Sequence, residues 1–207
     1  MAGLEVAILD YGAGNVASVA KAFNHLGADA RLTSSAAELA AARAIVVPGV
    51  GHFSRTASIG PDLRTAIRAA IDRRVPVLGI CLGLHWLSAG SSEAPDVRGI
   101  GVFRGACEPL HAAGSIKVPH VGWNSLEHTG RASRLLGGID NASFAYFCHS
   151  YALAEAPDTT AISRHGQAVS AVVERHNVFG AQFHPEKSGA VGLRLLQNFL
   201  GIVAETR

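Results

Sequence analysis

Short apolar runs alternate with segments of helical periodicity through the first half of the chain. The runs have the length of buried strands and cover residues 4–9, 30–32, 44–47 and 75–80. The segments between them repeat apolar side chains at helical spacing and cover residues 15–26, 36–42, 63–71 and 82–87. Because strands that alternate with helices form parallel βαβ units, the pattern predicts an α/β fold with a doubly wound sheet.

Beyond about residue 97 the pattern changes to short apolar segments with few helical signals. These predicted strands cover residues 100–103, 144–148, 160–163, 168–173 and 178–183. They favour an antiparallel extension of the parallel core. Residues 190–200 then carry the apolar stripe of an amphipathic helix. Since no linker or repeat interrupts the sequence, we expect a single domain over residues 1–207.

Composition narrows the functional classes. Apolar residues make up 48% of the 207, and the net charge of +2 favours neither nucleic acid nor an anionic membrane as a partner. No run approaches the ~20 apolar residues of a membrane span, and the first residues lack a signal-peptide pattern. Three cysteines without metal-ligand spacing fit the reducing cytoplasm and predict neither a metal nor a cofactor.

A cysteine stands where the strand over residues 75–80 gives way to a helix. Gly79 and Gly83 flank Cys81 as in the Gly-x-Ser-x-Gly nucleophile elbow, with sulfur in place of oxygen. N–H groups at the start of the helix can stabilise a thiolate and a developing oxyanion. The alternative is a buried structural cysteine, and this motif alone does not decide between the two.

A histidine and a glutamate follow the strand over residues 178–183. Attack of a thiol on an amide needs a base that returns the proton to the leaving nitrogen, and a third group that orients this base. His184 and Glu186 are two positions apart, so on an extended segment their side chains would share one face. A lone His-x-Glu pair is more often a solvated loop, but a nucleophile and a base at two strand ends favour a catalytic site.

Several blocks of the sequence together resemble a known family. The segments around Cys81 (Gly79 to Gly83) and His184 (Phe183 to Glu186) resemble the class I, or triad, glutamine amidotransferases, which have a flavodoxin-like architecture. Other blocks resemble one subfamily, the glutaminase subunits of imidazole glycerol phosphate synthases. These blocks cover residues 10–15, 48–51, 118–124 and 146–151. They keep the family's order from residue 6 to residue 188, and the first and third point to histidine biosynthesis.

The resemblance implies a catalytic triad. Cys81 would attack the side-chain amide of glutamine and form a glutamyl thioester, which water then hydrolyses. His184 would transfer the protons, and Glu186 would orient the imidazole. A non-catalytic module on the same scaffold would be favoured if one of these three residues were absent, and all three are present.

An oxyanion hole is implied in two segments. The backbone N–H of Leu82 would supply one donor. The other would come from the Pro-Gly-Val-Gly stretch that follows the strand over residues 44–47, with Val50 and Gly51 as the candidates. Taken alone, such a stretch is usually only a turn.

The family match also implies a glutamine pocket. Its members would be Gly49, His85, Glu93, Cys148, His149, Ser150 and Tyr151. Glu93 would face the α-amino group unless it is a solvated loop carboxylate, and a neutral structural His149 is at least as compatible with its apolar segment. This chain departs from the family at His85, where glutamine is usual. An imidazole has a different shape and can titrate, which changes the substrate binding and pH dependence to be expected.

A glutaminase is useful only beside an acceptor for its ammonia. The resemblance therefore implies a heterodimer with a (β/α)₈-barrel synthase subunit, which receives ammonia through a tunnel and makes imidazole glycerol phosphate and AICAR. The positions that match its interface are Asn15, Trp123, Tyr146 and Lys187. Trp123 fits either an interface anchor or simple core packing.

Two other enzymes remain as alternatives. One is a glutaminase that serves a different synthase, such as those for pyridoxal phosphate or anthranilate, which the two subfamily blocks disfavour. The other is a cysteine peptidase on a flavodoxin-like scaffold, which would not need the segment over residues 148–151.

Overall fold

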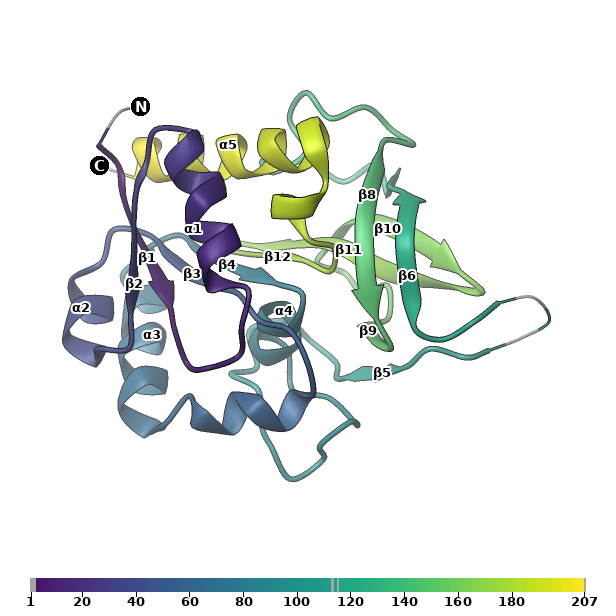
Figure 1. Cartoon of the computed structure of the whole chain (residues 1–207), viewed down its shortest axis with the longest axis horizontal. Coiled ribbons are helices and arrows are strands. Elements are labelled where there is room, and N and C mark those ends of the chain that lie inside the picture. The colour runs from purple at the N-terminus through teal and green to yellow at the C-terminus, as the bar shows by residue number, and fades with distance from the viewer. Residues whose placement is uncertain (1–2, 113, 115, 207) are drawn as a thin grey trace.

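The computed structural model describes residues 3–112, 114 and 116–206, and its elements follow the predicted alternation of strands and helices (Figure 1). The helices are α1 (Val16–His25), α2 (Ala36–Ala41), α3 (Pro61–Asp72), α4 (Leu82–Leu87), α5 (Gly189–Glu205) and the 3₁₀ helices η1 (Phe53–Ser58) and η2 (Pro185–Lys187). The strands are β1 (Glu5–Leu9), β2 (Asp29–Thr33), β3 (Ile45–Val47), β4 (Val77–Ile80), β5 (Cys107–Pro109), β6 (His120–Ser125), β7 (Glu127–His128), β8 (Phe144–His149), β9 (Tyr151–Leu153), β10 (Thr159–His165), β11 (Gln167–Arg175) and β12 (Val178–Ala181).

The main sheet has the order β2-β1-β3-β4-β12-β11-β10-β7. Its first five strands are parallel, and β11, β10 and β7 continue it in antiparallel pairing. The predicted parallel core with an antiparallel extension is therefore confirmed. The predicted strand over residues 144–148 is an exception, because it forms β8, which pairs with β6 in a separate two-stranded sheet.

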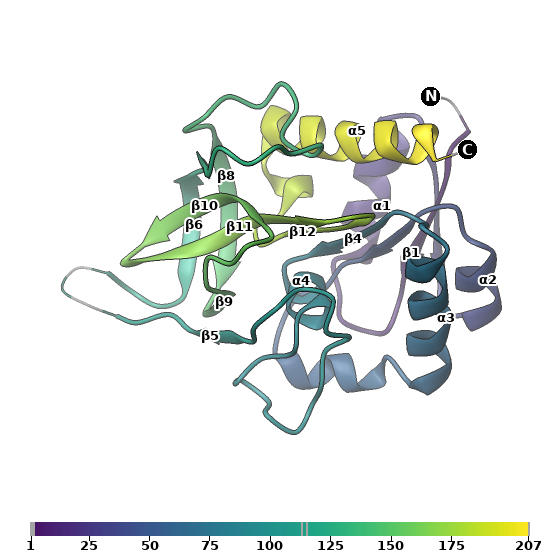
Figure 2. The same cartoon turned by 180° about the vertical axis from the view of Figure 1, so that it is seen from behind.

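Helices cover both faces of the main sheet, as the doubly wound pattern requires (Figure 1, Figure 2). Side chains of α1 and α5, among them Phe23 and Phe199, join one buried cluster with β1, β4 and β12. Side chains of α2, α3 and α4, among them Leu39, Ile67 and Trp86, form a second cluster with β3 and the opposite faces of β1 and β4. Strand β4 is buried along its whole length between the two.

The prediction of a strand over residues 100–103 is wrong. This segment has no strand structure; its N–H groups instead donate to carbonyls at the end of α4, with Ile100 bound to Trp86 at 2.7 Å and Val102 bound to Leu87 at 2.8 Å. The carbonyls of a last helical turn need such partners. The apolar pattern came from burial, since Ile100 and Phe103 are 6% and 1% exposed.

In the described part of the chain, no helix has the length and apolar character needed to cross a membrane. Nor do the side chains described there include a group of three or more histidines, cysteines and carboxylates placed to hold a metal ion.

Candidate active site

Cys81 occupies a sharp turn between β4 and α4. Its backbone has φ 52° and ψ −107°, a conformation that residues other than glycine rarely adopt. The turn requires the glycines on either side. A Cβ at Gly83 would lie 1.7 Å from the carbonyl oxygen of Val47, and one at Gly79 would lie 2.6 Å from the side chain of Leu87. The geometry is that of a nucleophile elbow.

His184 lies beside Cys81 because the strands that carry them are neighbours. Strand β12 pairs in parallel with β4, in a register that sets Ala181 against Ile80, so both strands end at the same edge. The Nδ1 atom of His184 lies 2.9 Å from Oε1 of Glu186, and each side chain is 1% exposed. The same carboxylate oxygen accepts a hydrogen bond from the amide of Asn15.

The route by which His184 reaches Glu186 differs from the expectation. The pair does not share a face of an extended segment, because Pro185 begins the 3₁₀ helix η2 and only His184 is extended, with φ −99° and ψ 97°. The turn brings the carboxylate back to the imidazole. Proline is well suited to the first position of such a helix.

The ionisation of this pair is set by mutual contacts rather than by burial. Burial alone would lower the pKa of His184, but hydrogen bonds to Cys81 and Glu186 outweigh it and raise this pKa to about 10. Burial would likewise raise the pKa of Glu186, whereas the hydrogen bond and charge of His184 bring it below its ordinary value. The pair therefore holds an imidazolium next to a carboxylate, with the sulfur of Cys81 as the second hydrogen-bond partner of the imidazolium.

A pocket of about 240 Å³ opens onto Cys81. Its walls combine the elbow, the Pro-Gly-Val-Gly segment and the β8–β9 turn. The residues that line it are Gly51, Cys81, Leu82, His85, Glu93, Pro119, Cys148, His149, Ser150 and Tyr151. Most of the predicted pocket residues therefore meet around the cysteine. Gly49 and Val50 are not among the lining residues, and Pro119 is a member that the sequence argument missed.

Two of the three predicted oxyanion donors, Leu82 and Val50, are engaged within the protein. The N–H of Leu82 donates to the carbonyl of Gly49 at 3.3 Å, and the N–H of Val50 donates to the carbonyl of Ala13 at 3.0 Å. The Gly49–Val50 peptide thus turns its oxygen toward the start of α4. Rotation of this one peptide unit would release the N–H of Leu82 and redirect that of Val50.

His85 is a buried neutral imidazole. It is 4% exposed, and its Nε2 atom lies 2.9 Å from the side-chain oxygen of Gln182. Burial lowers the pKa of His85 to about 4, against the opposing effect of this hydrogen bond. The titration near the substrate that the sequence suggested therefore falls well below neutral pH. Gln182, a polar side chain at the end of an otherwise apolar strand, is the site neighbour that the sequence argument missed.

His149 is held in one orientation by two hydrogen bonds. Its Nδ1–H donates to the carbonyl of Tyr151 at 3.0 Å, so its Nε2 atom accepts from Nδ1 of His120, also at 3.0 Å. Burial lowers the pKa of His149 to about 3, and the positive charge that His120 could carry acts in the same direction. A neutral, structural histidine is one of the two alternatives that the sequence left open for His149. Glu93, at the other side of the pocket, accepts a hydrogen bond from the N–H of Phe53 at 2.7 Å.

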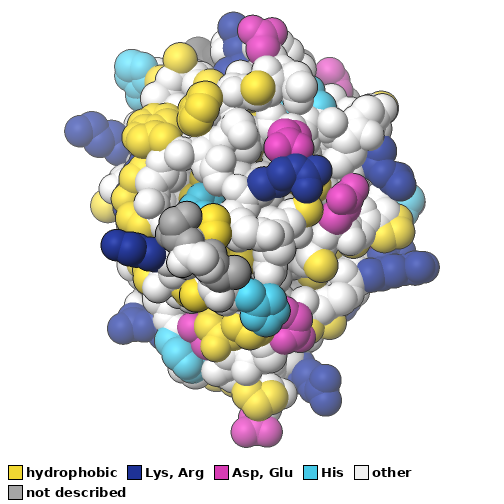
Figure 3. All heavy atoms as spheres, turned by 90° about the vertical axis from the view of Figure 1, so that its right-hand side faces the viewer, with side chains coloured by type: hydrophobic (Ala, Val, Ile, Leu, Met, Phe, Trp, Pro, Cys, Tyr) yellow, Lys and Arg dark blue, Asp and Glu magenta, His cyan; other side chains and the backbone are white. Residues whose placement is uncertain are grey.

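The outer face of the β6–β8 ladder exposes large apolar side chains. Val121, Trp123 and Phe144 are 55%, 56% and 57% exposed, so Trp123 is not a core residue. Its ring packs edge-on against Tyr146 at 6.1 Å, and Nζ of Lys187 lies 5.9 Å from the Tyr146 ring. Figure 3 shows hydrophobic side chains gathered along the left of this side of the molecule, over β6 and β8. The fourth predicted interface residue, Asn15, differs from Trp123, Tyr146 and Lys187, because its side-chain amide donates to Glu186.

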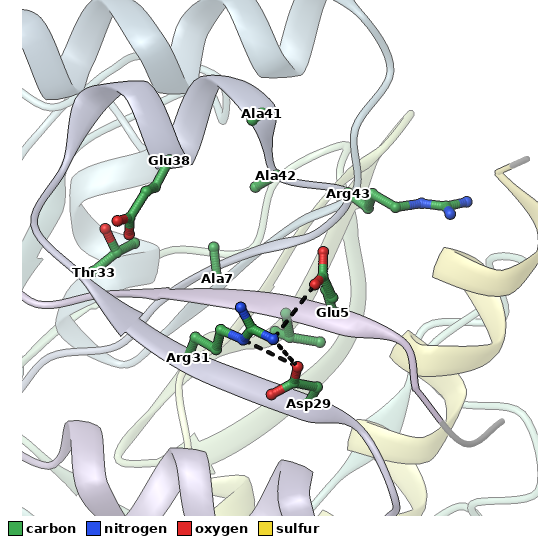
Figure 4. Close-up of a pocket in the computed structure, with 10 residues that line it drawn as sticks. Glu5, Ala7, Asp29, Arg31, Thr33, Glu38, Ala41, Ala42 and Arg43 are labelled. Atoms are coloured by element: carbon green, nitrogen blue, oxygen red, sulfur yellow. Dashed lines mark hydrogen bonds and ion pairs between the residues drawn. The ribbon is translucent and has the colours of Figure 1, made fainter.

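Another hollow lies at the β1–β2 edge of the sheet (Figure 4). Three of its charged groups pair with each other, since Arg31 contacts Asp29 at 2.6 Å and Glu5 at 3.7 Å. These side chains are well exposed. Solvent screens such pairs, so they do not make the hollow a candidate for the site.

Comparison with known proteins agrees with the fold. The family model described as glutamine amidotransferase class-I matches residues 7–202. A solved glutamine amidotransferase superposes with a TM-score of 0.74 at 19% identity, covering 96% of this chain and 98% of that one. The glutaminase domain of Trypanosoma brucei CTPS, solved with bound acivicin, gives 0.69 at 16% identity, with coverage of 98% and 94%. The chain belongs to the class-I glutamine amidotransferases.

The names of similar proteins place the chain in one subfamily. A protein from Deinococcus radiodurans is 46% identical over 204 residues, with 94% of this chain and 92% of the relative covered. A protein from Bacillus cereus strain B4264 is 40% identical over 202 residues, with 96% and 95% covered. Both are named imidazole glycerol phosphate synthase subunit HisH. Within its family, the chain therefore groups with the HisH subunits.

Proposed function

We propose that this chain is the glutaminase subunit of an imidazole glycerol phosphate synthase. It would hydrolyse glutamine to glutamate and ammonia and pass the ammonia to a (β/α)₈-barrel synthase subunit. The observation that carries the glutaminase assignment is the strained elbow at Cys81, which lines a pocket and lies beside a buried His184–Glu186 pair. The choice of synthase rests on the similarity to HisH subunits over almost the whole chain.

The first half of the reaction forms a thioester. The Cys81 thiolate attacks the side-chain carbonyl carbon of glutamine, and a tetrahedral oxyanion forms. The His184 imidazolium gives its proton to the amide nitrogen, the carbon–nitrogen bond breaks, and ammonia leaves. Glu186 holds the Nδ1–H of His184 at 2.9 Å, which keeps Nε2 as the atom that exchanges protons with sulfur and nitrogen.

The second half hydrolyses the thioester. Neutral His184 removes a proton from water, the hydroxide attacks the thioester carbon, and the carbon–sulfur bond breaks. Glutamate leaves, and the imidazolium and thiolate are restored. No metal or cofactor is needed for either step, because protons and electron pairs balance among water, substrate and these side chains.

The oxyanion needs donors that the structure keeps engaged. Leu82 offers an N–H at the start of α4, but the carbonyl of Gly49 occupies it at 3.3 Å. We infer that the Gly49–Val50 peptide rotates in the active state, freeing Leu82 and bringing the N–H of Val50 or Gly51 to the oxyanion. One such donor contributes about 10²–10³ in rate. A resting orientation of this kind keeps the chain from wasting glutamine.

The β6–β8 face is the proposed docking site for the synthase barrel. Its exposed apolar side chains would be buried in the heterodimer, with Trp123 and Tyr146 as aromatic anchors and Lys187 beside them. Tyr146 is also joined to the triad, since its carbonyl accepts the backbone N–H of His184 at 2.9 Å. Docking on this face would place the ammonia source beside the partner.

Co-expression with barrel synthases tests the proposal. The chain is expected to purify with the imidazole glycerol phosphate synthase barrel and to support glutamine-dependent formation of imidazole glycerol phosphate. Mass spectrometry of the quenched complex should find a glutamyl adduct on the peptide that contains Cys81. Activity with a pyridoxal phosphate or anthranilate synthase instead would reassign the partner. An adduct on another peptide would show that Cys81 is not the nucleophile.

A further inference from the structure

Gln182 bridges two side chains of the site from a fully buried position. It follows β12, is 0% exposed, and its backbone N–H donates to the carbonyl of Ala171 at 2.9 Å. Its side-chain oxygen lies 2.9 Å from Nε2 of His85, and its side-chain nitrogen lies 3.8 Å from the sulfur of Cys81. The amide thus spans the space between the pocket wall and the nucleophile.

The direction of each hydrogen bond follows from the inventory of donors. An amide oxygen only accepts, so Nε2 of His85 must carry the hydrogen. The amide nitrogen then faces the sulfur with an N–H group, which suits a thiolate rather than a thiol proton. With Nε2 protonated, Nδ1 of His85 is a bare acceptor. This buried atom has no partner among the described residues, and His85 lines the pocket.

We propose that Gln182 is a positioning residue that donates to the Cys81 thiolate, and that His85 fixes the orientation of its amide. This inference rests on the proposed function only in taking Cys81 as the nucleophile.

A comparison within the chain separates this role from ordinary buried packing. The amide of Asn177 is also buried, but it donates to the backbone carbonyls of Ile71 and Val75 at 3.0 and 2.7 Å. Such bonds fasten one segment to another. The side-chain contacts of Gln182 are instead with His85 and Cys81, two groups of the pocket. Its amide therefore acts on the chemistry of the sulfur more directly than on the stability of a loop.

The test is the rate at which iodoacetamide alkylates Cys81 in the isolated chain near neutral pH, followed by mass spectrometry of the Cys81 peptide. Gln182→Met keeps the length of the side chain and removes the donor. It should slow alkylation roughly three- to tenfold, the size expected for the loss of one hydrogen bond to the sulfur. Asn177→Leu is the matched control, expected to lower the unfolding temperature and leave the Cys81 rate unchanged. Equal rates for Gln182→Met and wild type would overturn the proposal, as would equal slowing in the control.

A second variant tests the proposal independently, in case Gln182→Met does not fold. His85→Leu leaves Gln182 in place but removes the group that orients it, so it should also slow alkylation of Cys81. The double variant should be no slower than Gln182→Met alone, because both changes act through one amide. Additive effects would show that His85 does not act through Gln182. If wild-type Cys81 reacts no faster than the exposed Cys148, the nucleophile assignment fails instead, which is a distinct result.

Discussion

The backbone N–H of His184 donates to the carbonyl of Tyr146 at 2.9 Å, so the proposed base is one hydrogen bond away from the exposed face of the β6–β8 ladder. Ser188 strengthens this link, because its hydroxyl accepts the N–H of Tyr146 at 2.9 Å and donates to the carbonyl of His184 at 2.7 Å. A partner that binds this face therefore contacts a strand that holds the triad. In the proposed heterodimer, docking and catalysis would therefore share strand β8.

Trp123→Ala tests the docking face. The side chain is 56% exposed, so its removal should leave the stability of the free chain nearly unchanged while weakening binding of the synthase subunit about 30-fold, the effect of a loss of ~2 kcal/mol at an aromatic anchor. Titration calorimetry with the barrel subunit measures the change. Leu32→Ala is the control, since Leu32 is 46% exposed on the distant strand β2. Unchanged affinity for Trp123→Ala would move the interface elsewhere.

Cys81→Ser tests the covalent mechanism. An alcohol lacks the nucleophilicity of a thiolate when its base is matched to sulfur, so glutamine-dependent turnover by the complex should disappear. Turnover with added ammonium salts at alkaline pH should persist, because that chemistry belongs to the partner. The comparison of the two nitrogen sources is the measurement. Glutamine-dependent activity close to wild type would end the proposed mechanism.

The roles of the triad residues separate in single-turnover experiments. His184→Ala should remove both formation and breakdown of the thioester, because the same imidazole moves both protons. Glu186→Gln should cost less than loss of the base, although orienting carboxylates have cost up to ~10⁴-fold. Trapping with labelled glutamine and acid quench measures the thioester. Normal accumulation of labelled enzyme in His184→Ala would show that another group is the base.

His85→Gln restores the residue usual in the family. Glutaminase activity of the complex should stay within about tenfold of wild type, an effect of roughly 1.4 kcal/mol or less. Because burial lowers the pKa of His85 to about 4, its imidazole stays neutral near pH 7, and glutamine affinity should show no ionisation step that the variant lacks. A loss beyond a hundredfold would give His85 a catalytic role.

The lowered pKa of His85 also predicts how the stability of the fold changes with pH. A histidine with a lowered folded-state pKa binds a proton more readily in the unfolded chain, so it destabilises the fold as pH drops from 6.5 toward about 4. Urea unfolding across this range should therefore show a steeper acid loss for wild type than for His85→Gln. Parallel curves would contradict the buried neutral form.

The sequence predicted the parts of the fold in which burial follows secondary structure. Strands β4 and β12 are apolar throughout, and their ends carry Cys81 and His184, so the site could be found before any contact was known. The segment at 100–103 misled because Ile100 and Phe103 are buried without being in a strand. An apolar pattern indicates that a segment is buried, and tertiary packing rather than a sheet buries this one.

Other features depended on contacts that no local pattern encodes. Strand β6 contains Gly122 and polar residues, and it is defined only by its pairing with β8. The exposure of Trp123 follows from that pairing as well. Gln182 lies in an apolar strand end, and its contacts with His85 and Cys81 span 97 and 101 positions of sequence. Single-sequence reasoning had no signal for these distances.

The isolated chain should be a poor glutaminase. In the structure the Gly49 carbonyl accepts the N–H of Leu82 at 3.3 Å, and the N–H of Val50 is held by Ala13 at 3.0 Å, so neither donor is free for an oxyanion. The synthase subunit and its ligand would favour the rotated peptide by binding preferentially to that state. Because one oxyanion donor is worth about 10²–10³ in rate, hydrolysis of glutamine by the liganded complex should exceed that of the free chain by at least that factor. Steady-state glutamate production, with and without the barrel subunit, measures it. Equal rates would mean that the resting peptide orientation does not limit turnover, and activation would have to be sought elsewhere.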